Sequence, residues 1–237
     1  MLRDPEKKIR LEEIRKKISD ACQDSGREER SVTLVAVSKK KPWEDIADFA
    51  SLGVRNFGEN YVQEALAKQQ ALKAAGLADL RWHLIGTLQS NKAKLVPGNF
   101  TLFHALDSLT LASKLDQAAG NSGVIQNCLL EVNVDAENSK GGIAVPLVEK
   151  TMEELNRFQN VRILGLMCIP SPSPDSEMRE PFARLRRIQE KLNREGIYRE
   201  RLGELSMGMS SDFEDAIREG ATIVRVGTAL FGDRAGR

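Results

Sequence analysis

The sequence begins with a helical pattern and continues as an alternation of apolar runs and amphipathic segments. From Pro5 to Cys22, apolar residues recur every three or four positions among charged residues, which is the spacing of an amphipathic helix. The next run, Val32–Val37, is short, nearly continuous and rich in β-branched residues, so it predicts a strand buried on both faces. Pro42 suits a first helical turn, and the apolar stripe that begins at Trp43 predicts a helix after this strand.

The same alternation repeats along the rest of the chain. Seven further runs are predicted strands: Val54–Phe57, Trp82–Ile85, Leu102–Ala105, Asn127–Val134, Val161–Cys168, Leu202–Met207 and Thr222–Val226. Further helical patterns lie between them: Tyr61–Ala74, Gln89–Val96, Leu109–Ala119, Pro146–Phe158, Ser176–Glu195 and Asp212–Glu219. Strands separated by helices pair in parallel through right-handed crossovers. We therefore expect an α/β fold, a closed (β/α)8 TIM barrel with an extra N-terminal helix; an open doubly wound sheet is the alternative.

The length of the chain agrees with one such barrel. Its 237 residues approach the roughly 250 of a typical α/β barrel, and no linker rich in Pro, Gly and Ser divides them. We expect a single domain over residues 1–237, with the N-terminal helix within 1–28 and the barrel within 32–232. The PSPSP segment Pro170–Pro174 follows the sixth strand, where it either shapes the active face or is a surface loop that merely ends the strand.

Composition and charge exclude several classes of protein. Hydrophobic residues make up 41% and charged residues 29%, as in ordinary folded proteins. With 35 Lys and Arg against 34 Asp and Glu, the net charge of +1 disfavours a nucleic-acid or membrane-surface partner, and the ligand is expected to be small. No window approaches the roughly 18 apolar residues of a membrane span, and the charged N-terminus does not resemble a signal.

The cysteines and histidines bear on compartment and metal chemistry. Cys22, Cys128 and Cys168 are far apart and odd in number, so they predict neither a disulfide framework nor a zinc site. A reducing cytoplasm fits this usage best. The chain has only 2 histidines, His83 and His104, and we expect no metal site.

Candidate chemistry is sought just past the carboxyl end of each strand, because these loops converge on one face of a barrel. The polar residues there follow the first, second, third, fifth, seventh and eighth strands or lie at their ends. They include Ser38, Lys39, Lys40, Lys41, Asn60, His83, Asn133, Lys140, Ser210, Ser211, Arg225, Gly227 and Thr228.

The segment MGMSSD, Met207–Asp212, is a candidate phosphate site. It is rich in Gly and Ser and leads directly into a predicted helix, whose unpaired N–H groups and positive end would bind an anion. Barrels often bind phosphate with the loops after strands seven and eight. The alternative is that Ser210 or Ser211 is only the N-cap of the helix, and the two interpretations are compatible.

Lys39 is the candidate for covalent chemistry. It lies two residues beyond Val37 and so points to the same side of the strand, whereas Lys40 points to the other side. A lysine beside apolar walls is desolvated, which lowers its pKa and lets the neutral amine form a Schiff base with an aldehyde. A Schiff-base lysine together with a phosphate site suggests pyridoxal phosphate. The alternative for each lysine is a solvated surface charge.

Arg225 ends the last strand two residues before Gly227, close enough to reach the same ligand. A guanidinium that faces the pyridine nitrogen of the cofactor would keep this nitrogen unprotonated and weaken the ring as an electron sink. The alternative is an arginine paired with a carboxylate at the barrel rim.

Seven blocks of the sequence resemble the pyridoxal phosphate homeostasis protein family, which is related to the N-terminal barrel of alanine racemase. They are VAVSKKKP (35–42), FGENYVQEA (57–65), WHLIGTLQSNK (82–92), NVDAENSKGGI (133–143), GLMCIP (165–170), LSMGMSSDFEDAI (205–217) and VRVGTALFG (224–232). The WHLIGTLQSNK string is the most specific. The blocks cover nearly the whole chain, from about residue 32 to 232, in the order of the family.

This resemblance implies a fold-type III barrel that binds pyridoxal 5′-phosphate, with Lys39 as the Schiff-base lysine. It further implies that Arg225 faces the pyridine nitrogen and Asn60 lies beside the ring. Ser210 and the backbone of Gly227 and Thr228 would hold the phosphate. His83 matches a strand-three histidine that lies either near the ring or satisfied in the core, and Lys140 matches a position where racemases carry an arginine near the cofactor, which suggests a secondary role.

The resemblance also implies a function in binding, buffering and supplying the cofactor, without a catalytic residue. Racemases of this fold type use a second β domain, and only five residues follow Gly232 here, so the two-base arrangement is not expected. We expect a monomer that transiently meets apoenzymes dependent on pyridoxal phosphate. The alternatives are a pyridoxal phosphate enzyme with weak amino-acid racemase activity and a barrel that binds another sugar phosphate.

Overall fold

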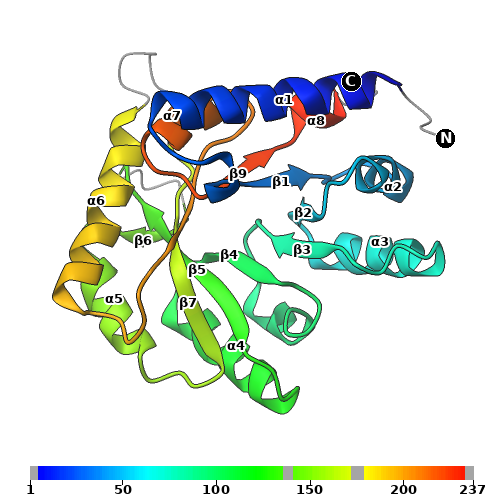
Figure 1. Ribbon diagram of the computed structural model, residues 1–237. Coiled ribbons are helices and arrows are strands. Elements are labelled where there is room, and N and C mark those ends of the chain that lie inside the picture. The colour runs from blue at the N-terminus through cyan, green and yellow to red at the C-terminus, as the bar shows by residue number, and fades with distance from the viewer. Residues whose placement is uncertain (1–4, 136–140, 172–178, 233–237) are drawn as a thin grey trace.

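Eight parallel strands close into a barrel in the computed structural model, which describes residues 5–135, 141–171 and 179–232 (Figure 1). The strands run in the order β4-β3-β2-β1-β9-β8-β7-β5, and β4 also pairs with β5, which closes the sheet. Their bounds are β1 Thr33–Val37, β2 Asn56–Glu59, β3 Arg81–Leu84, β4 Leu102–Leu106, β5 Gln126–Asn133, β7 Val161–Met167, β8 Glu204–Ser206 and β9 Ile223–Val226. The predicted barrel is confirmed, and the open sheet is excluded.

Each predicted strand corresponds to an observed one, with some shifted bounds. The largest shifts at a strand start are of two residues, in β8, which begins at Glu204 and not at Leu202, and in β2, which begins at Asn56 and not at Val54. Gly53 adopts the left-handed region with φ 88°, and the Val54 N–H donates to the Phe49 carbonyl at 3.1 Å, so this segment still ends the preceding helix. A short strand, β6 (Ile143–Ala144), pairs with β5 and was not predicted, because two residues give no periodicity.

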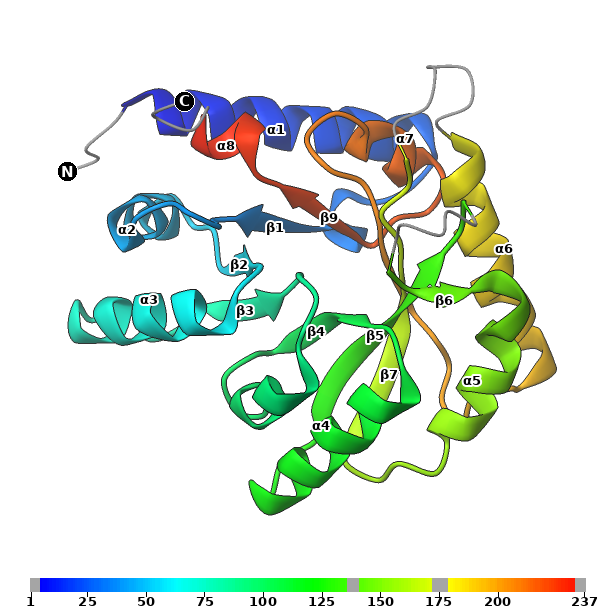
Figure 2. The ribbon, with the colours of Figure 1, turned by 180° about the vertical axis from the view of Figure 1, so that it is seen from behind.

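Helices separate most of the strands and cover the outside of the barrel (Figures 1 and 2). Their bounds are α1 Pro5–Asp24, α2 Trp43–Ser51, α3 Val62–Ala74, α4 Leu109–Asn121, α5 Val148–Leu155, α6 Arg179–Glu195, α7 Phe213–Arg218 and α8 Thr228–Phe231. Short 3₁₀ turns are η1 Glu29–Ser31, η2 Ser90–Leu95 and η3 Val145–Leu147. The helix predicted over Gln89–Val96 is wrong in type: it is the 3₁₀ turn η2, and Pro97, two residues after its end, prevents an α-helical continuation.

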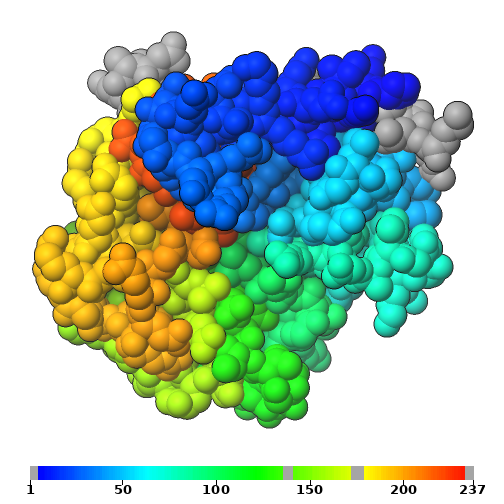
Figure 3. Space-filling view, viewed as in Figure 1, coloured from blue at the N-terminus to red at the C-terminus, as the bar shows by residue number. Residues whose placement is uncertain are grey.

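The extra N-terminal helix α1 lies along α7 and α8 (Figures 1 and 2). Its apolar face, which includes Leu11, Ile14 and Ile18, is buried. Lys7 fixes its first turns to α2, since its Nζ lies 2.6 Å from Asp45 Oδ1 and 2.7 Å from Asp48 Oδ2. Figure 3 shows the helix in blue along one edge of the molecule, with α6 in yellow near one end and α2 in lighter blue near the other.

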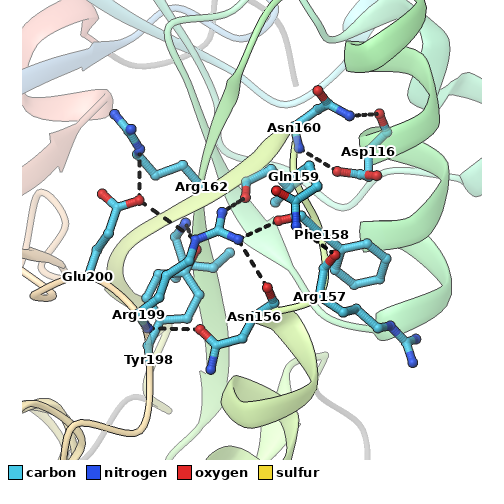
Figure 4. A network of polar contacts seen from close by, with 12 residues as sticks. Asp116, Asn156, Arg157, Phe158, Gln159, Asn160, Arg162, Tyr198, Arg199 and Glu200 are labelled. Carbon is cyan, nitrogen blue, oxygen red and sulfur yellow. Dashed lines mark hydrogen bonds and ion pairs between the residues drawn. The ribbon is translucent and has the colours of Figure 1, made fainter.

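A polar network ties the loops together at the amino-terminal end of β7 (Figure 4). The Arg199 guanidinium donates to three backbone carbonyls, those of Asn156 at 3.1 Å, Phe158 at 2.5 Å and Val161 at 2.9 Å. The Asn160 N–H donates to Asp116 Oδ1 at 2.6 Å, which joins this loop to α4. These contacts lie at the amino-terminal end of the strands, opposite the face where barrels carry their sites.

No helix within residues 5–135, 141–171 and 179–232 is both long and apolar enough to cross a membrane. Val35, Phe57 and Leu84 are among the fully buried apolar side chains of the strands, while the barrel interior also contains buried polar side chains. These are His83, His104, Glu131, Ser206 and Arg225. Such a polar interior requires hydrogen-bond partners, which are described below.

Candidate functional site

A cavity of about 330 Å³ opens at the carboxyl ends of the strands, on the face where barrels carry their sites. This volume lies at the lower end of the range for small-molecule pockets. The lining residues are Val37, Lys39, Asn60, Ile85, Ile169, Met209, Ser210, Ser211, Arg225, Gly227 and Thr228. The cavity thus brings together six of the seven residues that we expected to bind the cofactor, and His83 is not among its described lining residues.

The end of β1 presents Lys39 to the cavity. The strand ends at Val37, and Lys40 adopts a left-handed φ of 59°, which turns the chain away directly after Lys39. Lys39 is half-buried, whereas Lys40 is exposed. The Lys41 Nζ donates to the Phe231 and Gly232 carbonyls, each at 3.2 Å, so it is engaged outside the cavity.

A buried ionic cluster under this turn holds the residues on either side of Lys39. The Lys68 Nζ lies 2.7 Å from the Ser38 carbonyl oxygen, from Glu59 Oε1 and from Glu64 Oε1. The Ser38 hydroxyl donates to Glu59 Oε1 at 2.6 Å, and the Lys40 N–H donates to Glu64 Oε1 at 2.6 Å. Burial raises the pKa of Glu59, which the Lys68 and Ser38 hydrogen bonds oppose.

Arg225 extends from β9 into the barrel interior and forms part of the cavity wall. Its Nη1 donates to Ser206 Oγ at 2.6 Å, and its Nη2 donates to the Cys168 carbonyl at 2.9 Å. Burial lowers the pKa of this guanidinium, while Cys168, Asp212 and Glu131 raise it. Since the reference pKa of arginine is so high, the side chain stays a cation at neutral pH.

Ser210 links two loops at the cavity. The Ser210 Oγ accepts from the N–H groups of Gly227 at 3.2 Å and Ala229 at 3.4 Å, so it joins the loop after β8 to the loop after β9. The N-cap of α7 is Asp212, whose Oδ1 accepts from the Met209 N–H at 2.5 Å. Neither Ser210 nor Ser211 is therefore the N-cap, because Asp212 occupies that position.

Asn60 contributes a polar atom without a partner. Its Oδ1 is buried and has no hydrogen-bond partner among the described residues. Its backbone is held close to the loop after β3: a Cβ on Gly86 would lie 2.5 Å from the Asn60 carbonyl oxygen. A buried acceptor beside a cavity needs a donor from a ligand or from water.

His83 lies inside the barrel on β3. Its Nδ1 is 2.9 Å from His104 Nε2, and its Nε2 is 3.2 Å from Asn56 Oδ1, so both ring nitrogens are engaged within the barrel. Burial and the charge of Arg81 lower its pKa to about 4. This placement corresponds to the core interpretation of His83 and not to a contact with the cavity. Lys140, for which the resemblance suggested a secondary role, lies outside the described residues.

Several polar residues near the site did not emerge from the sequence patterns. Lys68 and Glu64 lie one turn apart on α3, a spacing common to solvated helical pairs, so they gave no signal of burial. Glu131 is 7% exposed, with its Oε2 unpartnered among the described residues. Burial and the nearby Asp107 raise its pKa to about 7, against the effect of Arg225. A lone glutamate within the apolar run CLLEVNV was a signal that could have found it.

Known proteins are similar to this one in sequence and in fold. The family model for the N-terminal domain of alanine racemase matches residues 9–235, so the fold is that of this class of barrel. The pyridoxal phosphate homeostasis protein of Aquifex aeolicus is 44% identical over 226 residues, which cover 95% of this chain and 97% of the relative. That of Escherichia coli K12 is 39% identical over 224 residues, covering 94% and 95%. The chain therefore belongs to the pyridoxal phosphate homeostasis protein family.

Solved structures agree with this assignment. PipY of Synechococcus elongatus, whose structure has pyridoxal phosphate bound, is 39% identical with a TM-score of 0.79, covering 91% of this chain and 100% of that chain. The alanine racemase of Clostridium difficile in complex with cycloserine is 14% identical with a TM-score of 0.72, covering 94% and 60%. At that identity the racemase supports the shared fold alone.

Proposed function

We propose that this protein binds pyridoxal 5′-phosphate in the cavity, holds it as a Schiff base on Lys39, and acts in the intracellular homeostasis of the cofactor. One observation carries the proposal: Lys39, Arg225 and Ser210 come from three separate loops or strands and line one cavity of about 330 Å³. The family relation and the cofactor-bound PipY structure support the same ligand.

The residues present fit the chemistry of this group. Its phosphate is a dianion, and the positive charge of Arg225 on the cavity wall favours an anionic ligand. None of the described contacts of Ser210 uses its hydroxyl proton, since its Oγ accepts from Gly227 and Ala229. This proton can therefore be donated to a phosphate oxygen, with the backbone of Gly227 and Thr228 beside it.

Arg225 and Asn60 are proposed to orient the ring. The Arg225 guanidinium can only donate hydrogen bonds, so toward a pyridine nitrogen it favours the unprotonated form. The buried Asn60 Oδ1 can accept from a hydroxyl group on the ring. The Lys39 amine would hold the cofactor through its aldehyde as a Schiff base, whose formation would release one water.

We propose holding and supply, and not turnover, as the activity. A ring whose nitrogen stays unprotonated is a poor electron sink, which restrains the chemistry that racemases perform on this cofactor. The second candidate, a weak amino-acid racemase, is favoured by the racemase fold. Incubation with single L-amino acids in deuterated water separates the two: we expect no α-carbon exchange above trace, and turnover of about 1 per second or more would establish an enzyme.

The cofactor site itself is tested by borohydride reduction of the purified, cofactor-loaded protein. We expect peptide mapping to find the reduced pyridoxyl group on Lys39, and Lys39→Ala to lose the label and the absorption of the bound Schiff base. Lys40→Ala is the matched control, because Lys40 is adjacent but exposed, and it should retain both. A native spectrum in Lys39→Ala would contradict the assignment.

The finer proposals are a monomer, a cytoplasmic location and transient delivery to apoenzymes. The three cysteines are buried thiols, which is consistent with a reducing compartment. Size-exclusion chromatography with light scattering tests the monomer. Delivery is tested by whether the loaded protein activates an apoenzyme faster than the same concentration of free cofactor.

A further inference from the structure

A continuous hydrogen-bond chain runs through the barrel interior from Arg225 to Asn56. Arg225 Nη1 lies 2.6 Å from Ser206 Oγ, and Ser206 Oγ lies 2.8 Å from His104 Nδ1. His104 Nε2 lies 2.9 Å from His83 Nδ1, and His83 Nε2 lies 3.2 Å from Asn56 Oδ1. Each distance is that of a hydrogen bond, so the five side chains form a continuous chain.

The hydrogen-bond chain joins the two ends of the barrel. Its members come from β9, β8, β4, β3 and β2, and Ser206 and His104 are 0% exposed. Arg225 borders the cavity at the carboxyl ends of the strands. Asn56 is the first residue of β2 and borders a separate cavity, together with Arg55 and Thr33, at the start of the strands. The chain therefore connects the proposed cofactor site to the opposite face of the barrel.

The donors and acceptors of this chain permit one order. Asn56 Oδ1 only accepts, so a neutral His83 donates to it from Nε2 and accepts at Nδ1 from His104 Nε2–H. This leaves His104 Nδ1 to accept the proton of Ser206. The Ser206 Oγ accepts in turn from Arg225, because a guanidinium only donates. These proton positions are assigned from the order of the partners.

Both histidines must be neutral for this order to hold, because a charged imidazole donates at both nitrogens and accepts at none. Burial lowers the pKa of both rings, to about 4 for His83 and well below its usual range for His104. The positive charge of Arg225 adds to this effect on His104. The electrostatics of the interior therefore agree with the order of the hydrogen bonds.

We propose that Ser206, His104 and His83 are positioning residues that hold the Arg225 guanidinium in one orientation at the cofactor cavity. This inference rests on the proposed function for its effect on cofactor binding. With Nη1 held by Ser206 and Nη2 held by the Cys168 carbonyl, the guanidinium plane cannot rotate. The Ser206 hydroxyl is held in turn, because its proton is committed to His104.

The first test needs no cofactor. The polypeptide has only 2 histidines, so ¹H–¹⁵N spectra of the protein without a histidine tag contain two imidazole spin systems. At pH 7 we expect both to be the neutral tautomer protonated at Nε2. A tautomer protonated at Nδ1, or a charged ring, in either histidine would overturn the proposal.

The second test removes the link between Arg225 and the histidines. In Ser206→Ala we expect pyridoxal phosphate to bind about tenfold more weakly and the absorption of the bound cofactor to shift, because the guanidinium loses a charge-assisted hydrogen bond. Ser51→Ala is the matched control, since its hydroxyl donates to the Asp48 carbonyl outside the barrel. Unchanged affinity and spectrum in a folded Ser206→Ala would overturn the proposal.

A third variant covers the case in which Ser206→Ala does not fold. Asn56 is half-buried, so Asn56→Ala removes the last acceptor of the chain at little risk to the core. We expect the imidazole signals of His104 to shift as well as those of His83, although Asn56 contacts only His83; a shift confined to His83 would overturn the proposal. If the wild-type protein bound no cofactor, the proposed function would fail, while these spectra would still decide whether the two histidines form the proposed order of hydrogen bonds.

Discussion

The Lys68 Nζ lies 2.7 Å from the carbonyl oxygen of Ser38, so a helical lysine fixes the residue directly before Lys39. The same ammonium holds Glu59 and Glu64, and Glu64 accepts from the N–H of the residue after Lys39. The position of Lys39 is therefore set by contacts on both sides of it in the chain.

Replacing Lys68 leaves the buried Glu59 carboxylate without its cation. We expect Lys68→Met to lower the free energy of unfolding by about 3 kcal/mol, which is typical of one partner lost from a buried ion pair, and to reduce borohydride labelling of Lys39. Urea unfolding measures the first effect. Lys73→Met, an exposed lysine of the same helix, should change stability by less than about 0.5 kcal/mol. The double variant Lys68→Met/Glu59→Gln should recover part of the loss, and no recovery would contradict the electrostatic cause.

Ser210 is expected to recognise the phosphate and not the ring. Ser210→Ala should weaken pyridoxal phosphate binding by about tenfold, because a hydrogen bond to an anion is lost. The affinity for pyridoxal, which has no phosphate, should stay the same, and this ligand is the control. Fluorescence titration with both compounds measures the two affinities. An equal loss for both would mean that the substitution disturbs the whole cavity.

The pH dependence of stability should reveal Glu131. Its pKa is about 7 in the folded protein, above the ordinary value of 4.5, so the folded state binds its proton more tightly than the unfolded state. The contribution of Glu131 to the free energy of unfolding is complete below about pH 4.5. Up to about 3 kcal/mol of it is lost as the pH rises through 7. Glu131→Gln should therefore gain stability over the wild type at pH 8 and much less at pH 5. Urea unfolding of the cofactor-free protein at the two pH values measures this, and an equal difference at both would contradict it.

Gly165 is expected to be essential for the pairing of β7 with β8. A Cβ at this position would lie 1.8 Å from the Glu204 carbonyl oxygen, a backbone atom that cannot move without breaking the sheet. We expect Gly165→Ala to cost at least about 3 kcal/mol or to prevent folding. Gly203→Ala is the matched control, because nothing lies within 4 Å of its added Cβ. Thermal unfolding of both variants makes the comparison, and equal melting temperatures would contradict the steric argument.

Arg199 should affect stability without affecting the site. Arg199→Ala removes hydrogen bonds to three backbone carbonyls at the amino-terminal end of β7, and we expect a loss of about 2 kcal/mol (Figure 4). Arg157→Ala, which loses an exposed ion pair at 3.6 Å and a cation–π contact at 4.9 Å with the Phe158 ring, should cost less than about 1 kcal/mol. Cofactor affinity should be unchanged in both, since the cavity lies at the other end of the barrel. A weaker affinity in Arg199→Ala would show that the two ends are coupled.

Much of the fold could be predicted because buried parallel strands are apolar runs. Val32–Val37 and Val161–Cys168 carry this pattern, and both predicted strands lie close to the observed β1 and β7. The alternation of strand side chains also separated Lys39 from Lys40, and the structure has Lys39 lining the cavity and Lys40 exposed. Local patterns fail where few residues are involved: β6 has two residues, and η2 is a short turn stopped by Pro97.

The sequence by itself determined the strand and helix order, the barrel class and the loops that could carry chemistry, because periodicity and strand ends are local properties. Only the tertiary structure decided what each polar side chain meets. It paired β4 with β5, turned His83 inward to His104, joined Ser210 to the loop of Gly227, and buried Lys68 with Glu59. These contacts join residues distant in the chain or residues whose local spacing is equally common on solvated surfaces, so no pattern along the sequence distinguishes them.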